Sequence, residues 1–492
     1  MTANTVLSRP EIQAKLTAAP LDVFVIGGGV VGSGVARDAA MRGLRTALVE
    51  QHDFAFGTSS RSSRLLHGGI RYLEQGRVGL VHEASVEKKT IRDIAPHLGD
   101  PLGFLFPSYK GKGWPVWQLR IGVKIYDLLC GGRNFQPSRG FNARETLEML
   151  PTLRSEKLGG CVRYFDALTS DARLVYDTLT SAARYGATVA NYLRFVDSTR
   201  EGDLWKIQLE DKITGQKYVV QAKTIVNATG PWAEQIRHSS VKLRLSKGIH
   251  VVIDRSRLPV PAAVVITEGK RIIFVLPWGK RVIIGTTDTD YQGAPEDVRV
   301  ANEDVTYVLR AVNDYFPSNA IKEKDIISSW AGIRPLIANP DGTPSDVSRA
   351  HQIKNPQPGW WDIAGGKLTT YRLMAEQAVD KIARFLGHSA GRSRTAQEPL
   401  LPTDVPNNFS GIVPPPVTRE AVEHYVKNEW AVHLDDVLVR RSSWHYYESG
   451  DLAERVATWM AEIAGWTPER RAQEIAAYRA AVGVPVPPPT KR

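Results

Sequence analysis

The amino-acid sequence predicts the α/β fold class: a Rossmann-like nucleotide-binding domain, an antiparallel-sheet domain and a helical C-terminal domain. An apolar run at 22–26 leads into three glycines and a helical pattern, as the first strand, turn and helix of a parallel sheet do. Short β-branched runs at 249–287 are typical of an antiparallel sheet. Residues 418–482 have helical periodicity and many charges. A chain of 492 residues can form roughly two to four such domains.

The first half of the chain is predicted to begin with an arm and a strand–helix–strand unit. Ser8 is a helix N-cap, with Pro10 in the first turn of that helix. Small residues share one side of the helix predicted at 32–42, and Gly43 ends it. The other elements predicted before residue 240 are strands at 22–26, 44–50, 204–209, 217–221 and 224–226 and helices at 77–95 and 169–185.

The second half is predicted to contain the antiparallel sheet and the helical region. Its strands are expected at 249–253, 263–267, 271–277 and 281–287, and a helix at 369–386 follows. The segment 100–160 is rich in Gly, Pro and Trp, and we assign it to the same region as this sheet. Pro-rich composition predicts a linker at 402–416 and a disordered tail at 483–492.

Charge and cysteine content limit the kinds of partner and compartment. The net charge of +11 favours anionic partners, which include phosphorylated small molecules, anionic lipid and nucleic acid. The chain has two cysteines, Cys130 and Cys161, which argues against a disulfide framework and against cysteine-rich metal sites. Residues 1–20 lack a secretory signal pattern, and we find no run of about 20 apolar residues. We therefore expect a cytoplasmic protein without a metal centre.

The most informative motif is the glycine-rich turn after the first predicted strand. Gly27, Gly29 and Gly32 form a G-x-G-x-x-G pattern that opens a helix, and Glu50 ends the second strand. The first glycine makes a tight turn, the second lets a pyrophosphate approach, and the third permits close helix–strand packing. The Glu50 carboxylate is placed to accept hydrogen bonds from a ribose diol. The strand, the helix and the acidic residue all fall in register, which predicts a dinucleotide site.

Three further segments favour FAD over NAD, because they suit a cofactor that lies extended across its domain. A small-residue turn at 227–230 follows a predicted strand, although such turns are common. The run at 58–72 is dense in hydroxyls, arginines and glycine, although Ser-rich runs are often plain loops. A glycine turn at 364–372 opens a helix whose amides can stabilise an anionic flavin, or is an ordinary helix start. The candidate FAD contacts are Gly27, Gly29, Gly32, Glu50, Thr58, Ser59, Ser63, Gly68, Gly69, Ala228, Gly230, Gly366, Lys367, Leu368 and Thr369.

Taken together, the motifs resemble those of the FAD-dependent, aerobic-type glycerol-3-phosphate dehydrogenases, within the D-amino-acid-oxidase-like flavoproteins. The resemblance covers about 22–386 and continues more weakly to about 478. Val30, Val31, Arg64 and Ala331 depart from the family pattern without removing a charge that the reaction needs. The matching motifs are SRLLHGGIRYLE at 63–74, NATGPW at 227–232, KGIH at 247–250, GTTD at 285–288, GIRPL at 332–336, GGKLTTY at 365–371 and DDVLVRR at 435–441.

The resemblance implies that sn-glycerol 3-phosphate is oxidised to dihydroxyacetone phosphate, with a hydride passing from C2 to flavin N5. Arginine pairs bidentately with a phosphate dianion, so the substrate-binding candidates are Arg71, Tyr72, Arg334, Arg349 and Lys367. A histidine is the expected general base near neutral pH. His250 is the first candidate for that base and His67 the second, and Arg334 and Lys367 complete the catalytic set.

The resemblance also implies where the electrons go. Ubiquinone or menaquinone is the expected acceptor, which places the protein peripherally on the inner face of the cytoplasmic membrane. The Trp- and Lys-containing segment at 112–129 is the candidate membrane contact, and packing inside the second domain is the alternative. Reduction of oxygen, another phosphorylated polyol as substrate, and a homodimer stay open. A nucleic-acid-binding flavoprotein is disfavoured, because no RNA- or DNA-binding signature is present.

The implied domain plan is discontinuous, because the FAD-binding segments are interrupted by those of a substrate-binding cap. The ranges are 1–20 for the arm, 21–99, 165–240 and 325–390 for the FAD-binding domain, 100–164 and 241–324 for the cap, 400–482 for the helical domain and 483–492 for the tail.

Overall fold

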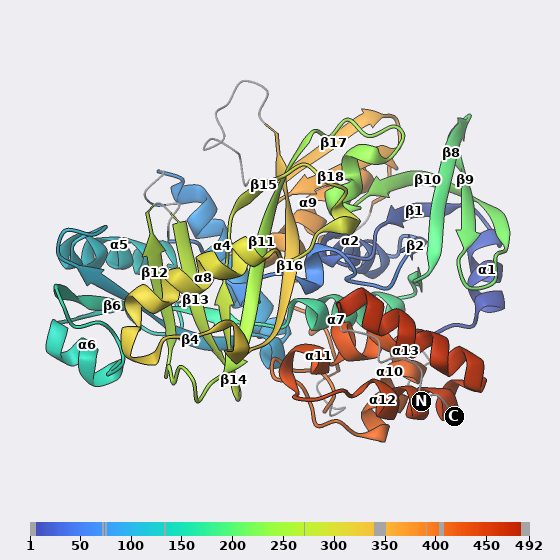
Figure 1. Ribbon diagram of the computed structural model, residues 1–492. Helices are drawn as coiled ribbons and strands as arrows, with labels where there is room; N and C mark the ends of the chain where they lie inside the picture. The colour runs from blue at the N-terminus through green and yellow to red at the C-terminus, as the bar shows by residue number, and fades with distance from the viewer. Residues whose placement is uncertain are drawn as a thin grey trace, which may run out of the picture.

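The chain forms two large sheets and a C-terminal group of helices (Figure 1). The predicted α/β class is therefore confirmed. The computed structural model describes residues 6–70, 73, 76–131, 134–269, 271–338, 351–389, 391–402 and 408–483. Residues 484–492 of the predicted tail at 483–492 lie outside these residues, as does part of the predicted linker.

The first sheet is the predicted Rossmann-like unit. β1 (Leu21–Ile26) pairs in parallel with β2 (Thr46–Val49) on one side and with β10 (Lys217–Asn227) on the other. The helix α2 (Val30–Met41) connects β1 to β2 and packs against α7 (Asp171–Arg184) and α9 (Tyr371–Phe385). The remaining strands are β7 (Thr188–Ala190), β8 (Leu193–Glu201), β9 (Leu204–Asp211), β17 (His351–Gln357) and β18 (Trp360–Gly365), and the order along the sheet is β17-β18-β10-β1-β2-β7.

One predicted break in this sheet is wrong. The sequence predicts two strands at 217–221 and 224–226, but β10 runs without interruption through Lys223. The Lys223 side chain lies at the surface, and its Nζ donates to Asp22 Oδ1 over 2.8 Å. The charge of Lys223 therefore does not prevent β10 from pairing with β1, because the side chain stays outside the core.

The second sheet contains the predicted antiparallel strands and more. β11 (Leu243–Asp254), β12 (Ala263–Glu268), β13 (Arg271–Trp278) and β14 (Arg281–Gly285) pair antiparallel in the order β11-β14-β13-β12, which confirms the prediction for 249–287. α8 (Asn302–Tyr315) lies across this sheet (Figure 1). The sheet also holds β3 (Leu65–Leu66), β4 (Asp100–Tyr109), β5 (Arg139–Phe141), β6 (Leu158–Leu168), β15 (Thr289–Tyr291) and β16 (Ile326–Ile337).

The pairing of β16 bears on how the two sheets are joined. The sequence places 325–390 in the first domain, but β16 runs antiparallel beside β11 along nearly its whole length. Backbone hydrogen bonding along such a ladder ties β16 to the second sheet, whereas the next strands, β17 and β18, belong to the first. β16 therefore links the two sheets, and the exact domain ranges stay a prediction.

The remaining helices cover the ends of the molecule. Ser8 is the predicted N-cap of α1 (Arg9–Thr17), and it forms a capping box with Glu11. The C-terminal helices lie beside α7 (Figure 1), and they enclose a core of their own around Tyr425, Leu438 and Trp444. The bounds are α4 (Val78–Ile94), α5 (Val116–Leu129), α6 (Ala143–Met149), α10 (Arg419–Asn428), a π-helical turn (Asp436–Arg441), α11 (Trp444–Tyr447), α12 (Ala453–Ala464) and α13 (Pro468–Val482).

Candidate functional site

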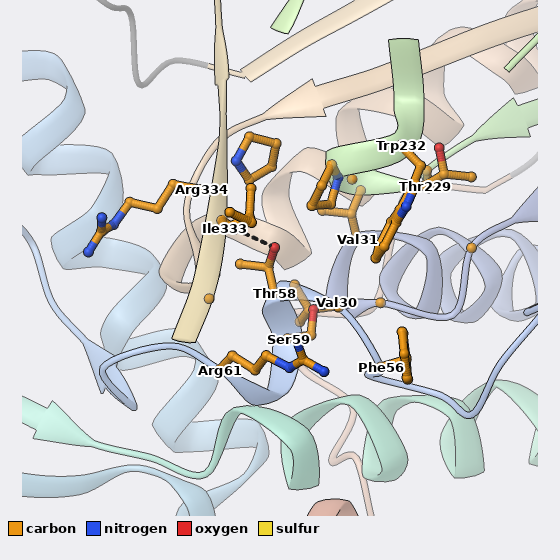
Figure 2. Close-up of a pocket in the computed structure, with 18 of the residues that line it drawn as sticks. Val30, Val31, Phe56, Thr58, Ser59, Arg61, Thr229, Trp232, Ile333 and Arg334 are labelled. Atoms are coloured by element: carbon orange, nitrogen blue, oxygen red, sulfur yellow. Dashed lines mark hydrogen bonds between the residues drawn. The ribbon is translucent and has the colours of Figure 1, made fainter. Parts of the chain in front are cut away.

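A cavity of about 330 Å³ lies where the carboxyl ends of the parallel strands face the second sheet. The turns after β1, β2, β10 and β18 form one wall, and residues of β11 and β16 form the other. Ligands of open α/β sheets bind in this place, outside the carboxyl ends of the strands. In Figure 2 Phe56 and Trp232 lie at the opposite side of the view from Arg334, so the lining residues extend over a long site.

The glycine turn after β1 has the geometry that a pyrophosphate needs. Gly27 has φ +108°, and a Cβ there would lie 2.6 Å from the Ala228 carbonyl oxygen. Gly29 lines the cavity and precedes the first turn of α2, and only Ser59 Oγ, at 3.2 Å, would approach a Cβ at this position. The space in front of the helix N-terminus is therefore open to an anion, and the helix amides favour negative charge there. A side chain at Gly32 would overlap the Gly27 carbonyl, so this third glycine serves packing.

Glu50 closes the same end of the cavity. Its Oε2 accepts from the Gly28 backbone N–H and its Oε1 from the His52 backbone N–H, both over 2.9 Å. Burial raises the pKa of this carboxyl, while the backbone donors lower it. Leu193 and Phe195 of β8 add apolar surface beside it. A carboxylate fixed by two amides next to an apolar wall fits a ribose and its attached base.

The loop after Glu50 carries the predicted hydroxyls into the cavity. Thr58 Oγ1 donates to the Ile333 carbonyl over 2.6 Å, which ties the loop to β16 (Figure 2). Ser59 Oγ accepts from the Val30 N–H over 3.0 Å and so lies at the helix N-terminus. Arg61 also lines the cavity, and burial lowers its pKa. The sequence analysis assigned no role to Arg61, although it lies inside the run that was singled out.

His250, on β11, lies in the wall of the cavity that the second sheet forms. Its Nε2 is hydrogen-bonded to Ser63 Oγ over 2.8 Å, and its ring stacks on Trp330 with centroids 5.0 Å apart. Its Nδ1 is buried and makes no hydrogen bond to the described residues. Burial, followed by the charges of Arg334 and Arg64, lowers the pKa of His250 to about 3. The imidazole is therefore neutral near pH 7 and can accept a proton.

This lowered pKa predicts a pH-dependent stability. An unfolded histidine has a pKa of about 6.5, so between the two pKa values the unfolded chain binds the extra proton and stability falls as the pH falls. We expect His250→Asn to reduce the slope of the unfolding free energy between pH 6.5 and 4.5 by up to about 1.4 kcal/mol per pH unit. Urea unfolding of FAD-loaded wild type and His250→Asn at these two pH values measures the two slopes. Equal slopes would show that His250 is not buried as described.

Arg334 projects into the cavity from β16, in the same wall. Its Nη2 donates to Thr286 Oγ1 over 2.9 Å, and both Nη atoms reach the Thr287 carbonyl at 3.2 Å. A side chain at Gly248 would collide with the Arg334 guanidinium and with Thr286, which accounts for the glycine in the KGIH motif. Lys367, in the turn after β18, lines the cavity as well. Two cationic side chains and a neutral histidine thus share one site.

The predicted site residues fall into three groups: those that line the cavity, those that do not line it, and those outside the described residues. Gly68 and Thr369 lie behind the lining: Gly68 N–H donates to Tyr126 Oη, and Thr369 Oγ1 accepts from the His67 N–H, both over 3.0 Å. Arg71, Tyr72 and Arg349 lie outside the described residues. Those that line the cavity are Gly27, Gly29, Glu50, Thr58, Ser59, Ser63, His67, Ala228, Gly230, His250, Arg334, Gly366, Lys367 and Leu368, whereas Gly32 and Gly69 do not.

Several side chains that line the cavity were not predicted from the sequence. The additional side chains include His52, Phe56, Arg61, Phe195 and Trp232. His52 and Phe56 lie close to Glu50 in the sequence. Their position directly after the predicted ribose-binding acid could have identified them as cavity residues. No signal in the sequence indicated Phe195, because only the pairing of β8 with β9 places it at the edge of the cavity.

Comparison with known families agrees with this geometry. The family described as FAD dependent oxidoreductase matches residues 22–376, which include both walls of the cavity. The family described as C-terminal domain of alpha-glycerophosphate oxidase matches residues 411–471.

Individual relatives agree with the family matches. Aerobic glycerol-3-phosphate dehydrogenases of Staphylococcus saprophyticus and Staphylococcus aureus are 39% and 38% identical, over 78% and 79% of this chain and 71% and 72% of theirs. The structure of glycerol-3-phosphate dehydrogenase from Bacillus halodurans complexed with FAD superimposes with a TM-score of 0.78 at 28% identity, over 98% of this chain and 99% of that one. L-alpha-glycerophosphate oxidase from Mycoplasma pneumoniae, at 16% identity over 78% of this chain and 99% of that one, shares the fold with a TM-score of 0.61.

The residues present fit FAD: an open glycine turn at a helix N-terminus, a ribose-binding acid and a long cavity that continues to the second sheet. FAD is the cofactor, as the sequence analysis expects. The chain belongs to the FAD-dependent oxidoreductases of the D-amino-acid-oxidase-like group, in the branch of the FAD-dependent glycerol-3-phosphate dehydrogenases.

Proposed function

We propose that the protein oxidises sn-glycerol 3-phosphate to dihydroxyacetone phosphate. The observation that carries this proposal is that a neutral His250 and the cations Arg334 and Lys367 line the same cofactor cavity, with Arg334 close enough to lower the pKa of His250. Bound FAD supplies the acceptor, flavin N5, for the hydride that leaves C2 of the substrate. The protein must hold the phosphate, take the proton of the C2 hydroxyl and keep the reacting carbon in place. The names of the relatives support this substrate.

Arg334 and Lys367 are the proposed phosphate-binding residues among those described. A guanidinium pairs with a phosphate through two parallel hydrogen bonds, and contacts to Thr286 and Thr287 already fix the direction of the Arg334 side chain. A fixed cation loses little conformational freedom when the dianion binds. Arg71, Tyr72 and Arg349 remain predicted substrate contacts.

His250 is the proposed general base. Ser63 and Trp330 hold the ring in one orientation, because the first bonds to Nε2 and the second stacks on the ring face. The pKa of about 3 keeps the ring unprotonated before substrate binds, and a bound phosphate dianion raises the pKa by favouring the protonated form. The base thus becomes stronger when substrate is present. His67, which lines the same cavity, is the second candidate.

The proposed electron acceptor is a quinone, ubiquinone or menaquinone, and the alternative acceptor is oxygen. Oxygen is kept as the alternative because the C-terminal region matches the family described as C-terminal domain of alpha-glycerophosphate oxidase. Steady-state turnover of sn-glycerol 3-phosphate with a quinone analogue distinguishes the two. We expect dihydroxyacetone phosphate to form with the analogue and little hydrogen peroxide to form in air. Peroxide release at the rate of substrate turnover would identify an oxidase.

An exposed apolar stripe on α5 supports docking to a membrane surface. Trp117 and Leu128 are 61% and 78% exposed, and Ile121 and Ile125 lie between them on the same side at helical spacing. The side chain of Lys124 is also mostly exposed. Apolar and basic residues together suit the headgroup region of an anionic bilayer. Within the described residues, no helix has the length and apolar character to cross a bilayer, so we propose peripheral attachment to the inner face of the cytoplasmic membrane.

We expect the double substitution Trp117→Ser and Leu128→Ser to lower binding to anionic phospholipid vesicles at least about tenfold, because it removes two large apolar groups from the contact. Cosedimentation measures the bound fraction. Val196→Ser with Val219→Ser, two exposed apolar residues on the β8–β10 edge, is the matched control and should leave vesicle binding unchanged. Unchanged binding of the α5 variant would contradict the proposal. A dimer that dissociates only in the α5 variant would identify the stripe as a homodimer contact instead.

A further inference from the structure

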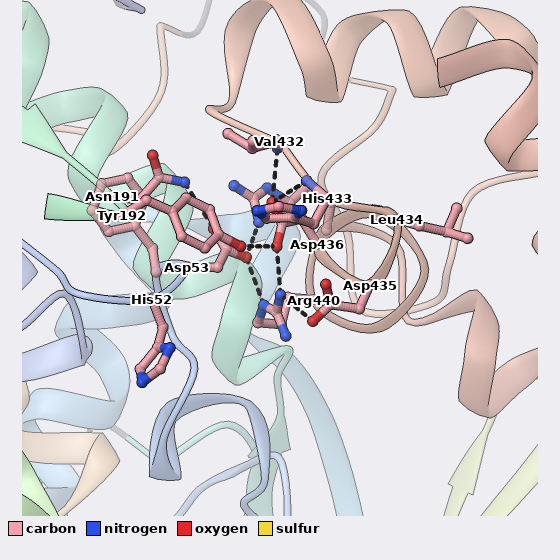
Figure 3. Close-up of polar contacts among 12 residues, drawn as sticks. His52, Asp53, Asn191, Tyr192, Val432, His433, Leu434, Asp435, Asp436 and Arg440 are labelled. Atoms are coloured by element: carbon pink, nitrogen blue, oxygen red, sulfur yellow. Dashed lines mark hydrogen bonds and ion pairs between the residues drawn. The ribbon is translucent and has the colours of Figure 1, made fainter. Parts of the chain in front are cut away.

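A buried group of charged residues joins the C-terminal helices to the loop that follows Glu50 (Figure 3). Asp53 is its centre and is fully buried. Asp53 Oδ2 accepts from Arg440 Nε over 2.5 Å, from Tyr176 Oη over 3.0 Å and from Arg441 Nη1. Its Oδ1 accepts from Asn191 Nδ2 over 3.1 Å. Both carboxylate oxygens are therefore satisfied by side chains from other elements.

The two arginines are in turn fixed by their own region. Arg440 Nη2 donates to Asp435 Oδ2 over 2.7 Å and to Asp436 Oδ1 over 2.6 Å. Arg441 Nη2 donates to the Glu429 carbonyl over 2.7 Å. Asp436 Oδ2 accepts from the backbone of the preceding turn, and its Oδ1 accepts from Tyr192 Oη over 2.6 Å (Figure 3). The guanidinium groups thus present a rigid binding surface to Asp53.

Electrostatics bind Asp53 to this surface in the ionised form. Burial alone would raise the pKa of Asp53, but Arg441 and Arg440 outweigh burial and hold the pKa well below its ordinary value. Burial, together with the carboxylates of Asp53 and Asp435, raises the pKa of Asp436. An ionised carboxylate buried in this way depends on its partners, and loss of one partner leaves an uncompensated charge.

The loop that Asp53 anchors is the loop that shapes the adenosine end of the cavity. Glu50, His52 and Phe56 line the cavity on either side of Asp53. Phe54 lies directly under the glycine turn, since a Cβ at Gly28 would lie 2.5 Å from its ring. On its other side the Phe54 ring packs edge-on against Trp430 of the C-terminal region, with centroids 5.5 Å apart.

Backbone hydrogen bonds complete the connection. The Ala55 N–H donates to the Gly28 carbonyl over 3.0 Å, and the His52 N–H donates to Glu50 Oε1 over 2.9 Å. The loop therefore contacts the glycine turn on one side and the C-terminal helices on the other. Its shape depends on both.

We propose that Asp53 is a positioning residue for FAD: through Arg440 and Arg441, the C-terminal helical region holds the ribose-binding loop in the form that binds the cofactor. Asp53 does not line the cavity, so its effect passes through Glu50 and His52. The C-terminal region is then a part of the cofactor site and not only a neighbouring unit. This inference concerns FAD binding and is independent of which polyol phosphate is oxidised.

The test is the dissociation constant of FAD for the full-length Asp53→Asn protein, measured by quenching of flavin fluorescence on titration of the FAD-free protein. We expect the constant to rise at least tenfold, which corresponds to about 1.4 kcal/mol. The backbone amides at 51–56 should also exchange with deuterium faster in the FAD-loaded variant, because the anchor of the loop is lost.

Arg173→Gln is the matched control. Arg173 of α7 forms a buried ion pair with Glu429 through hydrogen bonds of 2.5 and 2.7 Å, so it also joins the C-terminal region to α7. Among the described residues, its hydrogen bonds and ring contacts do not reach the loop at 50–56. Its loss should lower thermal stability and leave the FAD constant within about twofold of wild type. An unchanged constant in Asp53→Asn, or an equal rise in both variants, would overturn the proposal.

A milder variant covers the case in which Asp53→Asn does not fold. Arg440→Lys keeps the charge and removes the Nε hydrogen bond to Asp53. We expect FAD binding to weaken about threefold, with faster exchange confined to the loop at 51–56. Wild-type affinity and wild-type exchange in that loop would show that the arginine does not position it.

Discussion

Replacing Arg334 with Ala is expected to raise the KM for sn-glycerol 3-phosphate about 100-fold while FAD stays bound, because a bidentate charge-assisted pair with the phosphate is lost. The guanidinium belongs to β16, in the wall of the cavity that does not carry Glu50 and the glycine turn, and hydrogen bonds to Thr286 and Thr287 hold it there. Removal should therefore leave the dinucleotide contacts intact. Steady-state kinetics with a dye acceptor give the KM, and flavin absorbance gives the FAD content.

Two controls locate the effect at the phosphate. Arg334→Lys keeps a charge but not the planar pair of donors, so it should restore only part of the affinity. Turnover of glycerol, which lacks the phosphate, should be equally slow in wild type and Arg334→Ala. An unchanged KM in Arg334→Ala would remove Arg334 from the phosphate site, and loss of FAD would assign it to the cofactor instead.

Replacing His250 with Asn is expected to slow flavin reduction about 10²- to 10⁴-fold, the usual contribution of a general base, with a smaller change in substrate affinity. The ring is fixed by Ser63 and Trp330 and is neutral before substrate binds. A bound phosphate dianion then raises its pKa, which strengthens it as the acceptor of the C2 hydroxyl proton. Stopped-flow absorbance of the FAD-loaded protein under anaerobic conditions measures the rate directly.

The matched control for this prediction is His67→Asn, because His67 lines the same cavity and is the other histidine candidate. Ser63→Ala should give an intermediate rate, since it frees the ring without removing it. Flavin reduction at wild-type speed in His250→Asn, with a large loss in His67→Asn, would transfer the role of base to His67.

Local patterns in the sequence were enough to predict the glycine turn and four strands of the first sheet, β1, β2, β9 and β10, whereas β7, β8, β17 and β18 were not predicted. The apolar run before Gly27 and the helical pattern after Gly32 are set by near neighbours, and the structure confirms both as β1 and α2. The division of β10 at Lys223 was wrong, because hydropathy does not tell whether a charged side chain of a strand points out of the sheet.

Contacts between distant residues were beyond the sequence reasoning. Arg440 and Asp53 are 387 positions apart, and nothing local to DDVLVRR indicates that its arginines meet the ribose-binding loop. The role of Ser63 as a hydrogen-bond partner of His250, 187 positions away, likewise depends on distant contacts: the loop at 58–63 bonds to β16, which pairs with β11. Such long-range placements follow from the packing of the whole chain and not from a motif.

Anaerobic mixing of the FAD-loaded protein with sn-glycerol 3-phosphate tests the central proposal most directly, with glycerol and other phosphorylated polyols as comparisons. We expect the flavin absorbance to bleach rapidly with sn-glycerol 3-phosphate, with one dihydroxyacetone phosphate formed for each FAD reduced. Glycerol should bleach the flavin slowly, because it offers no phosphate to Arg334 and Lys367. A flavin that stays oxidised with sn-glycerol 3-phosphate, or that bleaches faster with another phosphorylated polyol, would contradict the proposed substrate.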